Sequence, residues 1–257
     1  DEYLKIRKNH KIGKNKSRRL SISDARKNKY SFNYESYKPK KPSFLGNKVF
    51  TNYSLEELRR YIDWTPFFRS WDLHGTYPNI FNDQVIGSAA KNLYKDANNL
   101  LDEIIKGNLL NARGVIGFWP ANSDLDDIIL FNDDKRNSKL AVFHTIRQQN
   151  SHSTDRPNYA LADFIAPISE NKIISDYIGG FALTCGHGEN ELSERFRENS
   201  DDYNSIMTKA LADRLAEAFA ERMHERVRKE FWGYSPKEEF DNDDLILSLI
   251  HISEPTR

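Results

Sequence analysis

The sequence is poor in several residue types and patterns, and each absence excludes a class of protein. Its 257 residues include one cysteine, Cys185, which excludes an internal disulfide and a CxxC metal framework. No apolar run approaches the roughly 20 residues of a membrane span, and the N-terminus lacks a signal-peptide pattern. We therefore expect a cytoplasmic protein that does not associate with a membrane.

Motifs for metal, nucleotide and nucleophilic chemistry are also weak. The histidines are scattered, and His224 has no second histidine at helical spacing, so we predict no metal site. The segment Arg113–Gly117 lacks the third glycine of a nucleotide loop and is typical of a strand start. Cys185 and His187 are too close in sequence to align readily as nucleophile and base, so we assign no catalytic residue.

Charge is balanced over the chain but unevenly distributed. There are 38 Lys or Arg and 38 Asp or Glu, yet residues 1–41 have a net charge of +10 and the remainder −10. A basic segment can bind nucleic-acid phosphates. Here the aromatic residues follow the basic run instead of alternating with it, and no nucleic-acid motif follows. We expect residues 1–50 to be a linker or arm, with no nucleic-acid partner.

Hydrophobic periodicity predicts an α+β fold, in which an antiparallel β-sheet packs with long helices. We expect helices over residues 55–61, 83–106, 189–198 and 201–232, and strands over 114–119, 128–131, 140–146, 159–165 and 177–184. The first of these helices is expected to end at Pro66. Short polar turns between consecutive strands favour the antiparallel arrangement.

The helix predicted over residues 201–232 is expected to be the spine of the domain. Apolar residues recur along it at every fourth position, and Gly233 provides a stop signal. On another face three acids fall in one row: Asp213, Glu217 and Glu221. Taken alone, this row is typical of a solvated face bridged by arginines from the same helix.

Asp63 is an unusual residue in its surroundings. It lies in the segment 62–71, where four of ten residues are aromatic. One interpretation is a cap or turn residue that accepts hydrogen bonds from nearby amides. The other is an anion presented to a positively charged ligand in an aromatic pocket. The residues alone leave both interpretations open.

Several blocks of sequence point to one family. They are Tyr61–Phe68, Lys95–Asn98, Arg113–Gly117, Pro120–Asn122, Arg147–Gln149, Leu161–Pro167, Asp176–Gly179, and the 201–232 helix with its Trp232-Gly-Tyr234 end. Together, and in this order, they resemble the activation domain of cobalamin-dependent methionine synthase. The resemblance runs from about residue 20 to residue 246.

The resemblance implies that this region binds S-adenosylmethionine (AdoMet) and supports the reductive methylation that reactivates oxidised cobalamin. The complete enzymes are methyltransferases that move a methyl group from methyltetrahydrofolate to homocysteine through cobalamin, with zinc in another domain. The implied partners are the cobalamin-binding domain of the same chain and flavodoxin or a similar reductase. The implied ligand-binding residues are Asp63 and Glu217, whereas Asp213 and Glu221 are expected to stay solvated or to bridge to other domains.

The resemblance also divides the chain. It implies that residues 1–50 are a linker from a preceding cobalamin-binding domain and that residues 51–246 are an incomplete activation domain. The family continues into an Arg-Pro-Ala-Pro-Gly-Tyr loop that forms the main part of the ligand site, whereas residues 247–257 match nothing in the family and are expected to be a non-native tail. We therefore expect a fragment, inactive alone, with weak or no AdoMet binding. One alternative is a protein-interaction module that docks on a cobalamin domain or a flavodoxin without a ligand of its own.

Overall fold

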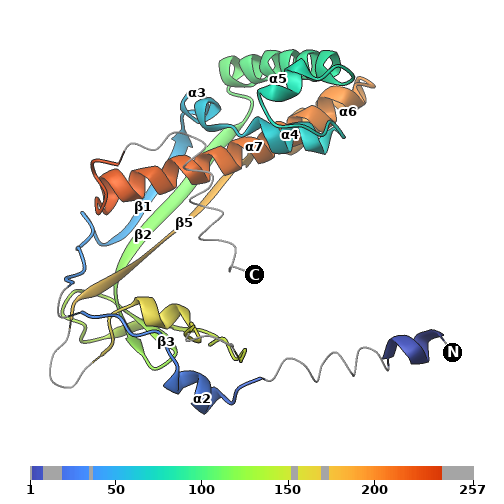
Figure 1. Ribbon diagram of the computed structural model, residues 1–257. Helices are drawn as coiled ribbons and strands as arrows, with labels where there is room; N and C mark the ends of the chain where they lie inside the picture. The colour runs from blue at the N-terminus through green and yellow to red at the C-terminus, as the bar shows by residue number, and fades with distance from the viewer. Residues whose placement is uncertain (1, 8–18, 35–36, 152–155, 169–173, 239–257) are drawn as a thin grey trace. The chain divides into compact units, whose positions relative to one another are not determined.

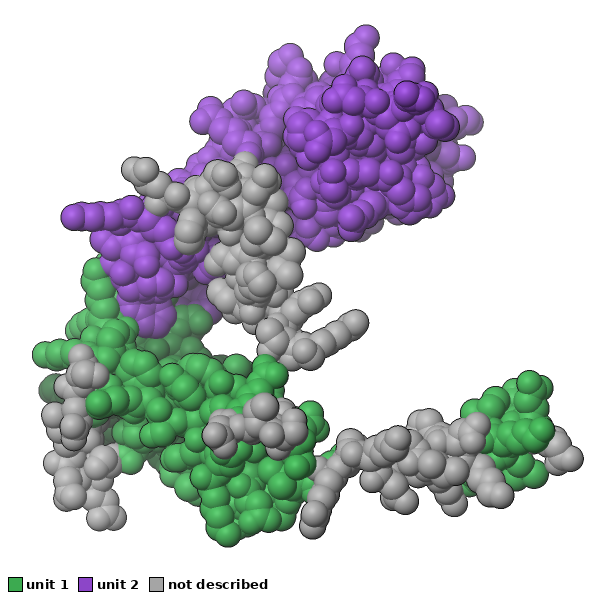
Figure 2. Space-filling view, in the orientation of Figure 1, with its two compact units in different colours: residues 1–46, 118–179 green, residues 47–117, 180–257 purple. Residues whose placement is uncertain are grey.

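The computed structural model describes residues 2–7, 19–34, 37–151, 156–168 and 174–238. The expectations about the basic residues 8–18 and the tail 247–257 lie outside these ranges. The chain forms two compact units, which Figure 2 shows in different colours, and Figure 1 shows the helices and strands. Unit 1 consists of residues 1–46 and 118–179, and unit 2 of residues 47–117 and 180–257.

Five strands form one sheet. They are β1 (Gly46–Tyr53), β2 (Asn111–Asp124), β3 (Asp127–Phe131), β4 (Lys139–His144) and β5 (Asp176–His187). The hydrogen-bonded order is β1-β2-β3-β4, and β5 also pairs with β2. The pairs β2–β3 and β3–β4 are antiparallel. In the β3–β4 pair the register shifts between Leu130 and Phe131, which marks a β-bulge. Strands β2 and β5 contribute residues to both units.

The helices fall mostly in unit 2. They are α2 (Ile22–Lys27), α3 (Leu55–Leu58), η1 (Arg59–Tyr61), α4 (Trp64–Ser70), η2 (Asn79–Asn82), α5 (Gly87–Gly107), η3 (Leu161–Phe164), α6 (Glu189–Glu198), α7 (Asp202–Arg226) and η4 (Val227–Phe231). Together with the sheet they confirm the predicted α+β fold class. None of the helices among the described residues is long and apolar enough to span a bilayer.

The predicted spine helix is present as α7, continued by the π-helical segment η4. Asp201 caps its start, where it accepts a hydrogen bond from the backbone N–H of Asn204 at 3.0 Å. At the other end Trp232 and Gly233 both donate to the carbonyl of Val227, at 2.8 and 3.1 Å. Gly233 adopts φ +70°, a conformation that glycine reaches without strain. Helices α3, η1, α4, α5 and α6 all pack on α7, which makes it the spine of unit 2 (Figure 1).

The core of unit 2 lies around α7 and the sheet strands of that unit. Its fully buried side chains include Leu58, Phe67, Phe68, Leu101, Ile104, Met207, Leu211, Leu215, Phe219 and Met223. Gly114 of β2 faces Leu183 and Phe219, and a Cβ at this position would collide with Leu183. Gly114 lies in a strand, as the sequence indicated, and its lack of a side chain allows this close packing.

Unit 1 combines a small apolar core with a buried ion cluster. The apolar part is formed by Ala121, Ile128, Leu130 and Ala162. The side chain of Arg147 is fully buried and donates to Asp126 at 2.8 Å and to both oxygens of Asp163 at 2.7 and 2.6 Å. Arg26 of α2 donates to the second oxygen of Asp126 at 2.7 Å. Each carboxylate of this cluster thus has an arginine partner.

Three local predictions are wrong. The strand expected over residues 159–165 is the short helix η3, because the side chain of Asp163 accepts from the N–H of Ala160 at 3.0 Å and closes the turn. Pro66 lies in the first turn of α4 instead of ending a helix. Backbone N–H groups in the first turn have no acceptor within the helix, so proline, which lacks this group, is tolerated there. Strand β1 begins at Gly46, within the expected arm, and is mostly exposed, so its sequence lacks the expected alternation. The domain boundaries stay a prediction.

Candidate functional site

Two carboxyl groups of unit 2, those of Asp63 and Glu217, both act electrostatically on a third, that of Glu221. Asp63 precedes α4, and the two glutamates lie one turn apart on α7. Burial raises the pKa of Glu221, and the charges of Asp63 and Glu217 both act on this group and raise its pKa further. The structure thus places both predicted ligand-binding residues beside a third acid, and we call these three residues the acidic site.

Asp63 is the N-cap of α4. Its Oδ1 accepts a hydrogen bond from the backbone N–H of Thr65 at 2.9 Å. The adjacent Trp64 is buried, with its ring edge-on to those of Phe67 and Tyr94 at centroid distances of 5.2 and 4.8 Å. The second carboxylate oxygen of Asp63 has no hydrogen-bond partner among the described residues. The cap interpretation is confirmed, and it leaves one oxygen for the ligand role, which stays a prediction.

Glu217 lies at the exposed rim of the acidic site. Its side chain is 57% exposed, and its two oxygens accept from Arg214 at 2.6 and 2.8 Å. The same guanidinium also donates to Asp213 at 2.6 Å. Asp213 is 69% exposed, which confirms the expectation that it is solvated. One arginine therefore pairs with two acids, so the net charge of these three side chains stays negative.

Glu221 is buried, with 7% of its surface exposed. Burial, together with the charges of Asp63 and Glu217, raises the pKa of Glu221 to about 8. Its Oε2 atom is buried and has no hydrogen-bond partner among the described residues. A buried polar atom without a partner normally costs about 1–3 kcal/mol, so each one calls for an explanation. In the described ranges Trp71, Asp134, Glu189 and His224 also have such an atom, but among these five residues only Glu221 is placed beside Asp63 and Glu217 by its electrostatic interactions. Of the two expectations for Glu221, that it stays solvated is wrong, whereas a bridge to another domain stays a prediction.

The burial of Glu221 is consistent with the number of elements that pack on α7. Several helices pack on it, so its buried residues extend well beyond the apolar stripe. The sequence contained a signal for this in Ala216, Ala218 and Ala220, because small side chains allow neighbouring elements to approach a helix closely. The apolar periodicity alone places Glu221 on a polar face.

The arginines of this helix that were expected to bridge the acid row are Arg214, Arg222 and Arg226, and two of them pair elsewhere. Arg222 donates to Glu57 and Glu225 at 2.5 and 2.8 Å. Arg226 pairs with a glutamate of η4 at 2.9 Å. Of these three arginines Arg214 alone pairs with acids of the row, namely Asp213 and Glu217. None of the three therefore forms an ion pair with Glu221.

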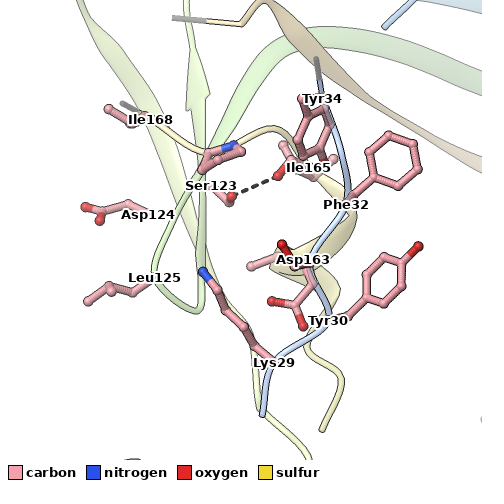
Figure 3. Close-up of a pocket in the computed structure, with 13 residues that line it drawn as sticks. Lys29, Tyr30, Phe32, Tyr34, Ser123, Asp124, Leu125, Asp163, Ile165 and Ile168 are labelled. Carbon is pink, nitrogen blue, oxygen red and sulfur yellow. Dashed lines mark hydrogen bonds between the residues drawn. The ribbon is translucent and has the colours of Figure 1, made fainter. Parts of the chain in front are cut away.

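Two cavities elsewhere are weaker candidates. In unit 1 a cavity of about 260 Å³ lies between residues 29–34, the β2–β3 turn and η3, beside the 2.8 Å hydrogen bond from Ser123 to the carbonyl of Ile165 (Figure 3). In unit 2 a cavity of about 320 Å³ is lined by residues of α5, α6 and the start of α7. None of the partnerless buried side-chain atoms found in the described ranges belongs to a residue that lines either cavity. The acidic site is therefore the stronger candidate.

The acidic site suits an organic cation. Within the described part of the chain, no group of three or more His, Cys, Asp or Glu residues is placed to hold a metal ion. Two opposite charges 4 Å apart attract each other by about 4 kcal/mol at the effective dielectric constant of a protein surface. A ligand with fixed positive charges would supply the compensation that Arg214 provides only in part.

Two comparisons with known proteins point to the same domain family. The family described as "Vitamin B12 dependent methionine synthase, activation domain" matches residues 54–250. A solved chain described as the MetH reactivation domain bound to AdoHcy (S-adenosylhomocysteine) is 48% identical in sequence. The match covers 90% of the present chain and 70% of that chain, with a TM-score of 0.85.

Proposed function

Because the chain belongs to the activation-domain family of vitamin B12 dependent methionine synthases, we propose that it binds AdoMet. The bound AdoMet would donate its methyl group to cobalamin during the reactivation of oxidised cobalamin. The observation that supports this most strongly is the 48% identical reactivation domain bound to AdoHcy, since AdoHcy is AdoMet without the transferred methyl group. The acidic site adds a physical reason, because AdoMet has a sulfonium and an ammonium group.

In this proposal Asp63 and Glu217 are the ligand-binding residues. Asp63 offers a carboxylate oxygen that the cap of α4 does not use, and the N-cap hydrogen bond to Thr65 fixes its orientation. Glu217 is held by two hydrogen bonds from Arg214, which limit its rotamers before the ligand arrives. Charge-assisted hydrogen bonds from the ligand to these two carboxylates would contribute about 1.5–3 kcal/mol each.

The remaining parts of the reaction belong to partners. Cobalamin, held by a neighbouring domain, would accept one electron and the methyl group, and AdoMet would leave as AdoHcy. We propose flavodoxin or a similar reductase as the electron donor. The complete enzyme would use the methylated cobalamin to transfer a methyl group from methyltetrahydrofolate to homocysteine, with zinc in another domain.

The proposal is tested by calorimetry on an extended chain, in which residues from 247 onward are replaced by the C-terminal segment of the homologous reactivation domain. We expect AdoMet binding that weakens about tenfold or more in the Asp63→Asn variant, because asparagine keeps the cap but removes the charge. The 257-residue chain is expected to bind weakly or not at all. An extended chain that does not bind AdoMet, or that binds it equally well with and without the Asp63→Asn substitution, would refute the assignment.

A second candidate function is docking on a cobalamin domain or a flavodoxin without a bound ligand. The described surface of unit 2 includes exposed Tyr234 and Ile206, which is consistent with a contact surface but does not identify a partner. A pull-down with a cobalamin-binding domain, with and without AdoMet, separates the two. Capture that persists unchanged without AdoMet supports docking as an independent activity.

A further inference from the structure

The proposed function leaves Glu221 without a role, although this acid is buried and, among the described residues, has a partnerless oxygen. It is 7% exposed, and its Oε2 atom is buried without a hydrogen-bond partner in the described ranges. It lies one helical turn from Glu217 and within electrostatic reach of Asp63. A carboxyl group placed in this way needs either a proton or a cation.

Among the described residues, the charged groups that act on Glu221 include a single cation, Arg214. The groups that act on Glu221 are Asp63, before α4, and Glu217 and Arg214, on α7. Arg214 is shared between Glu217 and Asp213. On the neighbouring elements, Glu57 of α3 pairs with Arg222, and Arg59 of η1 pairs with Asp102 at 2.6 Å.

An empty site therefore favours the neutral acid. Burial raises the pKa of Glu221, and the two neighbouring carboxylates raise it further, to about 8. AdoMet would reverse this balance, because its two positive charges stabilise an ionised carboxylate beside them.

We propose that Glu221 is a third carboxyl group of the AdoMet site, which holds a proton while the site is empty and releases it to solvent when the cationic ligand enters. The inference rests on the proposed function and names a further binding residue for it. The proton leaves the glutamic acid and is taken up by water or buffer, and no covalent bond to the ligand forms. Binding of AdoMet is thus linked to pH through one residue.

The test is calorimetry of AdoMet binding to the extended chain at pH 6.5, in two buffers with different ionisation enthalpies. We expect the release of roughly one proton per AdoMet, because a group with a pKa of about 8 is almost fully protonated at that pH. The Glu221→Gln variant should release none and bind more weakly. Asp213→Asn, on the same helix and exposed, is the matched control and should behave like the unchanged chain.

The dissociation constant supplies a second readout. It should fall about ninefold between pH 6 and pH 7 in the unchanged sequence and stay nearly constant in Glu221→Gln. The dissociation constants are compared only up to pH 7, because the α-amino group of a ligand such as AdoMet itself titrates at about pH 7.7–8.0 and would add its own pH dependence. AdoMet binding without proton release and without this pH dependence overturns the inference and leaves the proposed function intact.

A third measurement needs no ligand. Carbon NMR of the 257-residue chain, with the Glu221 carboxyl signal identified by its loss in Glu221→Gln, gives the titration midpoint directly. A midpoint far above the ordinary value of 4.5 supports the inference. A midpoint near that value overturns it, whether or not AdoMet binds. Failure of AdoMet to bind the extended chain, by contrast, refutes the proposed function.

Discussion

The two units contain buried carboxyl groups in opposite situations. In unit 1 Asp126 and Asp163 both accept from the fully buried Arg147, and Asp126 also accepts from Arg26. In unit 2 Glu221 is similarly buried, but its Oε2 atom has no partner in the part of the chain that the structure describes. The first arrangement satisfies its charges internally, and the second does not.

The difference separates a structural ion cluster from a ligand site. Removal of one member of a satisfied cluster leaves an uncompensated buried charge, so the cluster matters for stability. An unsatisfied acid destabilises the free protein in its charged form, and such groups are concentrated where a ligand supplies the missing charge. Stability measurements on matched variants of the two units test this distinction.

The largest expected effect is in unit 1. Replacement of Arg147 by methionine keeps the side-chain volume but leaves Asp126 and Asp163 buried without their shared cation. We expect a loss of about 3–5 kcal/mol in the free energy of unfolding of unit 1. Urea unfolding followed by circular dichroism measures it. The matched control is Arg26→Met, because Arg26 is 46% exposed and should contribute about 1 kcal/mol or less; equal losses in the two variants would contradict the comparison.

The next effect concerns the pH dependence of unit 2. The pKa of Glu221 is raised from 4.5 to about 8, so its folded form binds a proton more tightly than its unfolded form. The stability gained from that proton is complete below about pH 4.5 and is lost as the pH rises towards 8. Glu221→Gln keeps the neutral form at every pH, and its melting temperature should exceed that of the unchanged chain by about 10 °C more at pH 8 than at pH 5. Thermal unfolding at the two pH values measures this, and a pH-independent difference would show that Glu221 is not protonated in the free domain.

A smaller effect separates the two roles of Asp63. Asp63→Ala removes the N-cap of α4 and should cost about 1 kcal/mol of stability. Asp63→Asn keeps the cap, so its stability should stay within about 0.5 kcal/mol of the unchanged chain while AdoMet binding is weakened. Chemical unfolding and calorimetry on the same two variants provide both numbers. Equal destabilisation by both variants would show that the charge of Asp63, and not its hydrogen bond, supports the fold.

The smallest effect is expected at Asp213. This side chain is 69% exposed and pairs only with Arg214 among the described residues, which keeps its two hydrogen bonds to Glu217 without it. Asp213→Asn should change stability by less than about 0.5 kcal/mol and the AdoMet dissociation constant by less than about twofold. A larger loss of binding in calorimetry would extend the acidic site to this residue.

Much of the fold could be predicted from the sequence because its periodic segments are long. The helices α6 and α7 and the strands β3 and β5 were expected within a few residues of their observed ends. Strand β1 and the short helix η3 were missed, because one is mostly exposed and the other is closed by a side chain, Asp163, that also pairs with a distant arginine. Local patterns cannot report such tertiary contacts.

The candidate site was predictable in part. The two interpretations of Asp63 were both visible in its neighbours, and the resemblance selected Glu217 from a row of three acids. Glu221 was missed because helical periodicity identifies the apolar face of a helix but not how many other elements cover it. The helices α3, η1, α4, α5 and α6 pack around α7, and the sequence of α7 alone does not specify this packing.

The cap formed by Asp63 has a consequence for sequence divergence. Asparagine can replace aspartate as an N-cap with little loss of stability, yet it abolishes the charge. Selection for folding alone would therefore tolerate asparagine at this position, and only selection for a cationic ligand would retain aspartate. Among homologues of this domain, the residue at position 63 should distinguish proteins that still bind such a ligand from those that have kept only the fold.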